Sequence, residues 1–143
     1  MKPYDVGMIC GRFQTFHKGH ESLVKTGLEL CDRVLILIGS AQECGTERNP
    51  LNINTRTKML KEIYGDNSNI MIYGLADLTN ENDIDNMVNY LINKYEHIDI
   101  LINNAAFYYD EPLEEKTKDT FMKVLDTNLV GPFLLSREIA KYM

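Results

Sequence analysis

The chain has 143 residues, a length that suits a single domain with a hydrophobic core of its own. Its composition, 44% hydrophobic and 25% charged, is that of an ordinary soluble globular chain. The net charge of −6, with no basic stripe to balance it, argues against binding to nucleic acid, and no apolar stretch approaches the ~18 residues of a membrane span.

The cysteines and the N-terminus indicate a reducing compartment. Cys10, Cys31 and Cys44 are odd in number and lack a C-x-x-C spacing, so we expect free thiols in a reducing cytosol. Lys2 leads straight into an apolar strand without a signal peptide, so the expected location is the cytoplasm. Two of the cysteines with two nearby histidines could in principle bind zinc. Structural zinc sites generally use paired, closely spaced ligands, however, so we predict no metal site.

Strands and helices alternate along the whole sequence. Short apolar runs predict strands over 5–10, 33–39, 69–73 and 98–103, and apolar residues at helical spacing predict helices over 20–31, 54–64, 82–95 and 116–143. Gly131 and Pro132 lie inside the last of these helices and predict a bend or a break there. Such alternation predicts an α/β fold with a parallel sheet and right-handed crossovers.

The segment from Gly11 to His20 carries the clearest chemical signal. It reads Gly-Arg-Phe-Gln-Thr-Phe-His-Lys-Gly-His and joins the first predicted strand to the first predicted helix. Backbone N–H groups at a helix N-terminus favour anions, and glycine lets the backbone approach them closely. Because Arg12, Lys18 and two imidazoles accompany these donors, the segment is suited to a polyphosphate. We therefore predict phosphate binding, and the reaction classes that this allows are phosphoryl or nucleotidyl transfer.

The same segment resembles the first signature of the HxGH nucleotidylyltransferases, above all the nicotinamide-mononucleotide adenylyltransferases of the archaeal type. Further matches follow in order at 38–42, 47–51 and 55–60, so the resemblance covers roughly residues 4–78. Thr15 departs from the family, which usually has proline there, and the loop loses a restraint on φ.

This resemblance implies a particular reaction. His17 and His20 would contact the phosphates of ATP and stabilise charge at the attacked α-phosphorus. A mononucleotide phosphate is already a nucleophile, so the protein would supply in-line positioning and charge neutralisation. Mg²⁺ would accompany ATP if the chain is active, and no other cofactor is implied. The stretch from Gly39 to Gln42 would border the nucleotide.

From about residue 84 the chain resembles a different family, the short-chain dehydrogenases/reductases. Residues 98–106 match that family's Asn-Asn-Ala-Gly motif after its fourth strand, and Asn128 matches the asparagine of its fourth helix. Both resemblances imply a Rossmann-like three-layer sandwich with a four-stranded parallel sheet in the order 3-2-1-4.

In that strand order the pocket takes residues from both resembled families. The loop with His17 and His20 would lie beside the loop that follows the fourth strand, at the point where the direction of sheet growth reverses. The predicted catalytic residues, if activity is retained, are His17 and His20. The predicted nucleotide- and phosphate-binding residues are Gly11, Arg12, Phe13, Gln14, Lys18, Gly19, Gly39, Ser40, Asn49, Arg56, Asn103 and Asn104.

Neither resemblance is complete. The reductase-like part lacks the Gly-rich dinucleotide loop, the catalytic serine and the Tyr-x-x-x-Lys pair, and the transferase-like part lacks the late Ser/Thr-x-x-Arg signature that grips the β- and γ-phosphates. We therefore interpret the chain as an engineered chimera in a single domain, transferase-like over about 1–80 and reductase-like over about 81–143. The junction is expected between about 70 and 86, and a natural truncated fusion is the alternative.

The predicted site residues also have structural interpretations. His17 and His20 could be helix-capping or surface histidines, and Arg56 could be a solvated residue of a first helical turn. The asparagines after the fourth strand could satisfy backbone groups, a role that we favour for them and for Asn128. Two aromatic residues of the following loop could cover the mouth of the pocket or pack locally, and these are Tyr108 and Tyr109.

Three functions remain open. The first is a folded chimera with a residual nucleotide-binding loop and little or no catalysis. The second is a working nicotinamide-nucleotide adenylyltransferase, in which the reductase-like half only rebuilds the sheet. The third is an NAD(P)-binding module, which is weakest because the Gly-rich fingerprint is absent. The expected ligand is ATP or a mononucleotide, and the exposed face of the last helix could pair two copies, as the long helix does in the resembled reductases.

Overall fold

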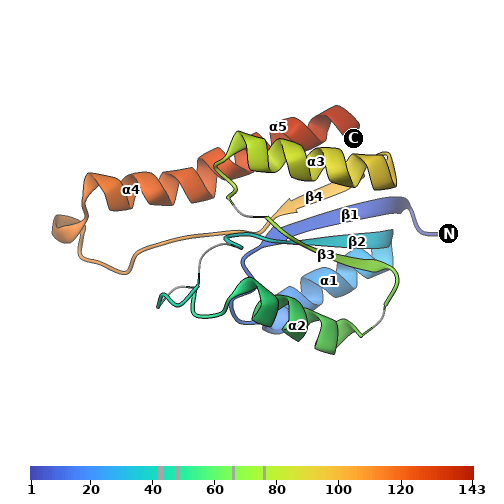
Figure 1. Ribbon diagram of the computed structural model, residues 1–143, viewed down its shortest axis with the longest axis horizontal. Coiled ribbons are helices and arrows are strands. Elements are labelled where there is room, and N and C mark those ends of the chain that lie inside the picture. Colours follow the sequence, from blue (N-terminus) through green and yellow to red (C-terminus); the bar gives the residue numbers. More distant parts are fainter. Residues whose placement is uncertain (42–43, 48, 66, 76) are drawn as a thin grey trace.

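The computed structural model describes residues 1–41, 44–47, 49–65, 67–75 and 77–143. Its strands are β1 (Tyr4–Gly11), β2 (Cys31–Ile38), β3 (Ile70–Gly74) and β4 (Ile100–Asn103). Its α-helices are α1 (Lys18–Leu30), α2 (Ile53–Tyr64), α3 (Glu81–Tyr95), α4 (Lys118–Leu125) and α5 (Gly131–Ile139) (Figure 1). A π-helical segment, η2 (Asp126–Val130), joins the last two, and short 3₁₀ turns lie at η1 (Leu113–Glu115) and η3 (Ala140–Tyr142).

The strands form one parallel sheet in the order β3-β2-β1-β4. Met8 at the centre of β1 lies opposite Leu35 on β2 and Leu101 on β4, and Leu35 in turn lies opposite Met71 on β3. The strands β2 and β3 lie on one side of β1, and β4 lies on the other side. The direction in which the sheet grows therefore reverses at β1, and the carboxyl end of β1 lies at the switch point. The predicted α/β class and the strand order 3-2-1-4 are confirmed.

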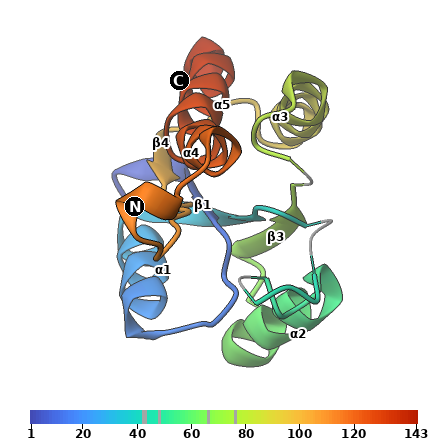
Figure 2. The same ribbon diagram turned by 90° about the vertical axis from the view of Figure 1, so that its left-hand side faces the viewer.

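Helices cover both faces of the sheet and make three layers (Figure 2). One face packs against α1 and α2 through a cluster that includes Val24 and Leu60, both fully buried. The opposite face packs against α3 and α5 through a larger cluster that includes Ile84 and Leu135. Side chains alternate along each strand, so the buried run on β2 supplies both clusters, as its continuous apolar sequence predicts.

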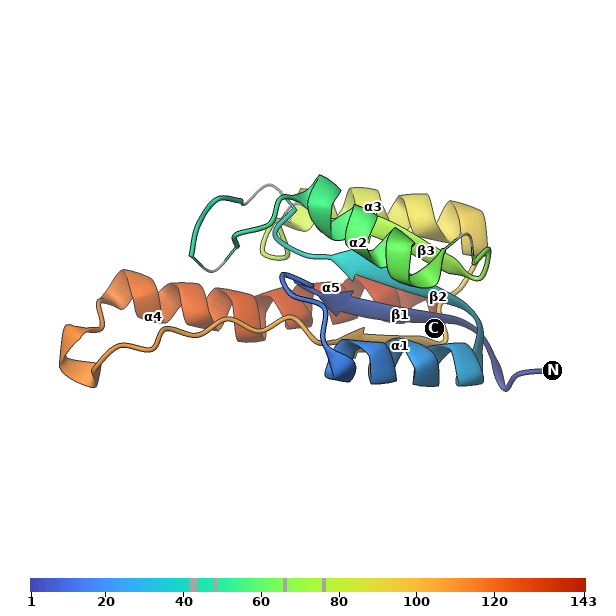
Figure 3. The same ribbon diagram turned by 90° about the horizontal axis from the view of Figure 1, so that it is seen from below.

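The C-terminal helices extend beyond the sheet. Figures 1 and 3 show α4 projecting past the carboxyl ends of the strands, with the segment that follows β4 running out alongside it. The chain stays helical through Gly131 and Pro132, and the irregularity that they predict takes the form of the π segment before them. The N–H of Gly131 donates to the carbonyl of Asp126, five residues back, whereas Pro132 has no N–H to donate.

Several element boundaries differ from the predicted ones because side-chain caps decide them. α1 begins at Lys18 rather than at residue 20, since His17 caps it, and α2 begins at Ile53 rather than at residue 54, because Asn52 caps it. β4 begins at Ile100, two residues later than expected. In the part of the chain that the structure covers, none of the helices has both the length and the apolar character needed to cross a membrane.

Candidate functional site

The loop that leaves β1 ends in a histidine cap. Nδ1 of His17 accepts hydrogen bonds from the backbone N–H groups of Gly19 and His20, at 3.1 and 3.4 Å. Because Nδ1 is the acceptor, the ring proton of neutral His17 lies on Nε2. A Cβ on Gly19 would lie 3.0 Å from Cε1 of His17, so glycine makes room for the capping ring. The helix-capping interpretation of His17 is therefore correct.

His20 lies in a stack of rings at the same helix terminus. Its ring centroid is 3.8 Å from that of His17, in a stacked arrangement, and 4.8 Å from that of Phe13. Burial lowers the pKa of His20 below its ordinary value, the neighbouring His17 lowers it further, and a hydrogen bond with the backbone of Thr15 opposes the shift. At neutral pH, an anion at this terminus would therefore meet an uncharged His20 and the positive end of the α1 dipole, rather than two charged histidines.

A buried arginine joins the loops that follow β1 and β2. The Arg56 side chain is fully buried in α2, and its guanidinium donates 2.8 Å hydrogen bonds to the carbonyl oxygens of Arg12, Gly39 and Ser40. Phe13 and Ser40, at these two loops, both have a φ of 50°, a conformation that non-glycine residues rarely adopt. Arg56 thus holds two unusual turns side by side, and its interpretation as a solvated residue is wrong. Its predicted contact with a phosphate stays a prediction.

Two further predicted site residues bind each other. Nε2 of Gln14 donates to Oδ1 of Asn49 at 2.9 Å, and the backbone N–H of Leu51 donates to Oε1 of Gln14 at 3.0 Å. Asn49 is buried, and its own N–H donates to Oγ1 of Thr46. These bonds tie the loop before α1 to the loop before α2. Gln42, predicted to border the nucleotide, lies outside the described residues, as does residue 48 of the matched 47–51 stretch.

The segment after β4 lies beside the loop of α1, as the strand order predicts. The N–H of Asn104 donates to the carbonyl of Cys10 at 2.8 Å, which continues the pairing of β4 with β1. Asn103 points elsewhere, because its Nδ2 donates to Oγ of Ser136 on α5 at 3.0 Å. Asn128 grips the backbone of Phe107, accepting from its N–H and donating to its carbonyl, both at 2.7 Å. The structural role expected for Asn128 is confirmed.

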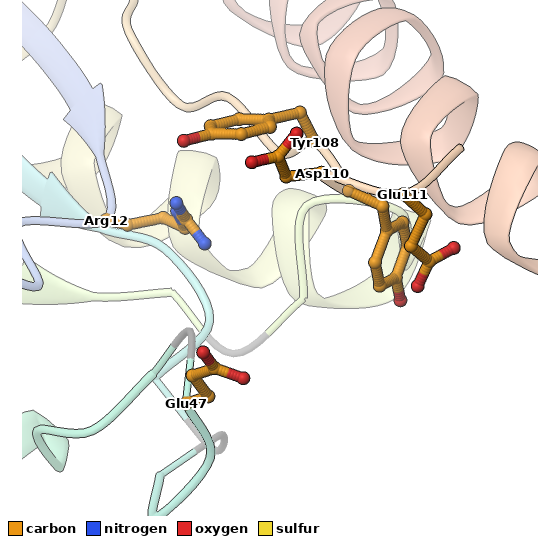
Figure 4. A pocket seen from close by; sticks show the side chains of 6 residues that line it. Arg12, Glu47, Tyr108, Asp110 and Glu111 are labelled. Carbon is orange, nitrogen blue, oxygen red and sulfur yellow. The ribbon is translucent and has the colours of Figure 1, made fainter. Parts of the chain in front are cut away.

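Two neighbouring pockets open at the carboxyl edge of the sheet. The pocket at the histidines has a volume of about 310 Å³, and its described lining consists of Arg12, Phe13, Gln14, Thr15, His17, His20, Asn104, Ala106 and Tyr108. The adjoining acidic pocket has a volume of about 530 Å³ and is lined by Arg12, Glu47, Tyr108, Tyr109, Asp110 and Glu111 (Figure 4). Arg12 and Tyr108 line both, so the two pockets meet at these side chains.

The structure brings together six of the predicted residues in the pocket at the histidines, namely Arg12, Phe13, Gln14, His17, His20 and Asn104. The other predicted residues are outside its described lining, namely Gly11, Lys18, Gly19, Gly39, Ser40, Asn49, Arg56 and Asn103. The sequence also gave no sign of the acidic pocket. Its carboxylates stand at 47, 110 and 111, and only the strand order brings these distant positions together.

No group of three or more metal-ligating side chains (His, Cys, Asp or Glu) occurs within the described ranges. Cys10 and Cys31 are buried and Cys44 is exposed, all three as free thiols. Burial raises the pKa of Cys10 to about 12, so this thiol stays protonated.

The parallel sheet, its flanking helices and the pocket at its switch point define a Rossmann-like α/β protein. The sequence profile of the short chain dehydrogenase family matches residues 39–143, which is well over half of the chain. The chain belongs to this family.

Comparison with curated proteins finds a second relationship, on the N-terminal part of the chain. The nicotinamide-nucleotide adenylyltransferase of Saccharolobus solfataricus is 40% identical over 80 residues, 53% of this chain and 46% of that protein. The enzyme of the same name from Ignicoccus hospitalis is 45% identical over 59 residues, 41% of this chain and 34% of that protein. The chain therefore matches less than half of each of these two curated relatives. The predicted double resemblance, transferase first and reductase after it, is confirmed.

Solved structures show the likeness in fold. A 3-oxoacyl-reductase from Bacillus thuringiensis has a TM-score of 0.73 at 20% identity, covering 97% of this chain and 52% of that chain. The NADPH-bound carbonyl reductase from chicken fatty liver has a TM-score of 0.74 at 16% identity, covering 95% and 50%. The reductase profile begins at residue 39, earlier than the expected change of family near 84, so an 80-residue N-terminal match and the profile overlap.

Proposed function

We propose that this chain binds a nucleotide by its phosphates at the N-terminus of α1 and has little or no adenylyl-transfer activity. The observation that carries the proposal is a single pocket lined by His17 and His20 from the transferase-like part and by Asn104 and Tyr108 from the reductase-like part. The helix dipole, the backbone donors of the first turn and the imidazoles favour an anion there. ATP or a mononucleotide is the proposed ligand.

We further propose that the chain is an engineered chimera of the two families, folded as one domain. We place its junction between about residues 70 and 86. Both families use the same β-α-β unit there, which is why one sheet accommodates both parts. A cytoplasmic location fits the free thiols.

The proposed chemistry at the pocket is binding and positioning. Nε2 of His17 would donate to a phosphate oxygen, while the α1 terminus would neutralise part of the charge on the phosphates. Mg²⁺ would be held by the phosphates themselves and would supply further neutralisation of charge on them.

Weak transfer activity is expected because the set of phosphate contacts is incomplete. Adenylyl transfer needs all the phosphates held in line and neutralised together. The residues beyond the proposed junction are of the reductase type, and none of them forms the Ser/Thr-x-x-Arg element that clamps the leaving pyrophosphate in the transferases. Loss of several kcal/mol of transition-state stabilisation lowers the rate about tenfold for each ~1.4 kcal/mol, whereas ground-state binding suffers less.

The test combines binding with turnover. Thermal unfolding is measured with ATP, nicotinamide mononucleotide or NAD. The unfolding temperature should rise most with ATP, because a ligand that binds only the native state stabilises it. NAD formation from ATP, nicotinamide mononucleotide and Mg²⁺ should be at or near background. Robust NAD formation that the His20→Ala variant abolishes would instead establish a working adenylyltransferase. Stabilisation by NAD alone would favour the NAD(P)-binding module, an alternative that the NADPH-bound reductase among the structural neighbours supports.

We also propose that two copies pair through the C-terminal helices. Phe121, Leu129 and Phe133 follow one another at helical spacing along α4, η2 and α5, and they are 56%, 63% and 61% exposed. A row of exposed apolar side chains at helical spacing is a candidate interaction surface. The helix α4, which carries Phe121, projects beyond the sheet (Figure 3).

A further inference from the structure

Tyr108 stands between two anchored residues of the segment that follows β4. On one side, the backbone of Phe107 is gripped by Asn128 through two 2.7 Å hydrogen bonds, and its ring is buried. On the other side, the ring of Tyr109 packs edge-on against that of Phe107 at 4.8 Å, and its carbonyl accepts from Nζ of Lys116 at 3.3 Å. The backbone on both sides of Tyr108 is therefore fixed.

The Tyr108 side chain itself is presented to the pockets. It is 68% exposed and lines both the pocket at the histidines and the acidic pocket. Figure 4 shows it extending from the segment after β4 toward the side of the cavity where Arg12 lies. An exposed aromatic ring carried on a backbone held in this way offers a wide apolar face that a flat ligand group can cover.

Charge sets the orientation of a nucleotide in the joined pockets. Glu47, Asp110 and Glu111 line the acidic pocket and repel phosphate, whereas the pocket at the histidines has the N-terminus of α1. The phosphates therefore belong at the histidines, and the uncharged base belongs toward the boundary that Tyr108 shares with both pockets.

Resting on the proposed nucleotide function, we propose that Tyr108 is the platform on which the aromatic base of the nucleotide stacks. The base site would then come from the reductase-like part and the phosphate site from the transferase-like part. Asn128 would act as a positioning residue, because it fixes the backbone next to Tyr108. Stacking on an aromatic side chain discriminates little between bases, since every base has a π-face.

The experiment compares two ligands on the full chain by calorimetric titration. Tripolyphosphate tests the phosphate site alone, and ATP tests the phosphate site together with the base. Tyr108→Ala should weaken ATP binding about tenfold, the scale of one stacking contact, and leave tripolyphosphate binding unchanged. Tyr108→Phe should bind both ligands like the original chain. Tyr90→Ala is the matched control, because Tyr90 is also an exposed tyrosine, on α3, and packs against Tyr73 instead.

Each outcome decides one of the two proposals. Equal ATP affinity in Tyr108→Ala and the original chain would overturn the platform, as would an equal loss of ATP and tripolyphosphate binding. Failure of the original chain to bind either ligand would overturn the proposed function and the platform with it. Circular dichroism and the unfolding temperature of each variant verify that it is folded, which the exposure of Tyr108 leads us to expect.

Discussion

His20 lies against His17 and Phe13, and this setting controls its charge. Its pKa is lowered in the folded chain, chiefly by burial, from about 6.5 in the unfolded chain. Below pH ~6.5 the unfolded chain therefore binds more protons at this position than the folded chain does, and stability falls as the pH falls.

This linkage gives the first prediction. Between pH ~6.5 and 5, the original chain should lose more free energy of unfolding than the His20→Gln variant, which has no titrating ring. Urea unfolding at several pH values measures the difference. Parallel stability curves for the two proteins across this range would contradict the assignment.

The second prediction separates the two roles of His17. His17→Ala removes the acceptor for the N–H groups of Gly19 and His20 and should cost ~1 kcal/mol of stability. His17→Asn supplies a preferred capping oxygen and should retain most of that stability, yet it lacks Nε2. In urea unfolding, the His17→Asn variant should therefore be clearly more stable than the His17→Ala variant, while phosphate binding should weaken in both. A phosphate affinity retained by His17→Asn would show that the imidazole makes no contact with the anion.

The third prediction concerns Arg56. Arg56→Ala leaves one buried and two part-buried carbonyl groups without their 2.8 Å donors, and an unsatisfied buried group costs ~1–3 kcal/mol, so a loss of about 3 kcal/mol is expected. Lys58→Ala is the control on the same helix, because Lys58 is exposed and its 3.8 Å pair with Glu62 contributes at most ~1 kcal/mol. Equal midpoints of the two variants in chemical denaturation would refute the role given to Arg56.

At the level of elements, the apolar row on α4, η2 and α5 is the feature with the most direct consequence. If it pairs two copies, the original chain should have twice the monomer mass in light scattering, and Phe133→Glu should shift it to monomer without loss of helicity. Phe133 is exposed in the single chain, so the charge has no folding cost there. A monomeric original chain at high concentration would contradict the pairing.

The elements also mark how far the sequence could be interpreted. Apolar runs and helical spacing predicted every strand, the four main helical segments and the parallel order, because burial on both faces leaves a clear pattern. The π segment was not predicted, since Pro132 signals an irregularity but not its type. The starts of α1 and α2 were displaced because caps at His17 and Asn52 decide them, and histidine is not among the usual capping residues.

The candidate site was predicted in part, and the reason lies in the scale of its contacts. The segment 11–20 is continuous in sequence, so its histidines and its position at a helix N-terminus were visible in the pattern. The burial of Arg56 depends on three carbonyl groups from two distant loops, and the acidic pocket depends on positions 47, 110 and 111 meeting in space. Side-chain contacts of this kind leave no periodicity in the sequence.

At the level of the whole molecule, the central claim is that one pocket, built from two family-derived parts, binds a nucleotide. The most direct measurement is a titration of the ¹⁵N-labelled chain with ATP, followed by NMR of the backbone amides. We expect saturable shifts in two separate segments, residues 11–20 around α1's N-terminus and 104–108 after β4. Shifts confined to residues outside these two segments, or no saturable shift at all, would contradict the account.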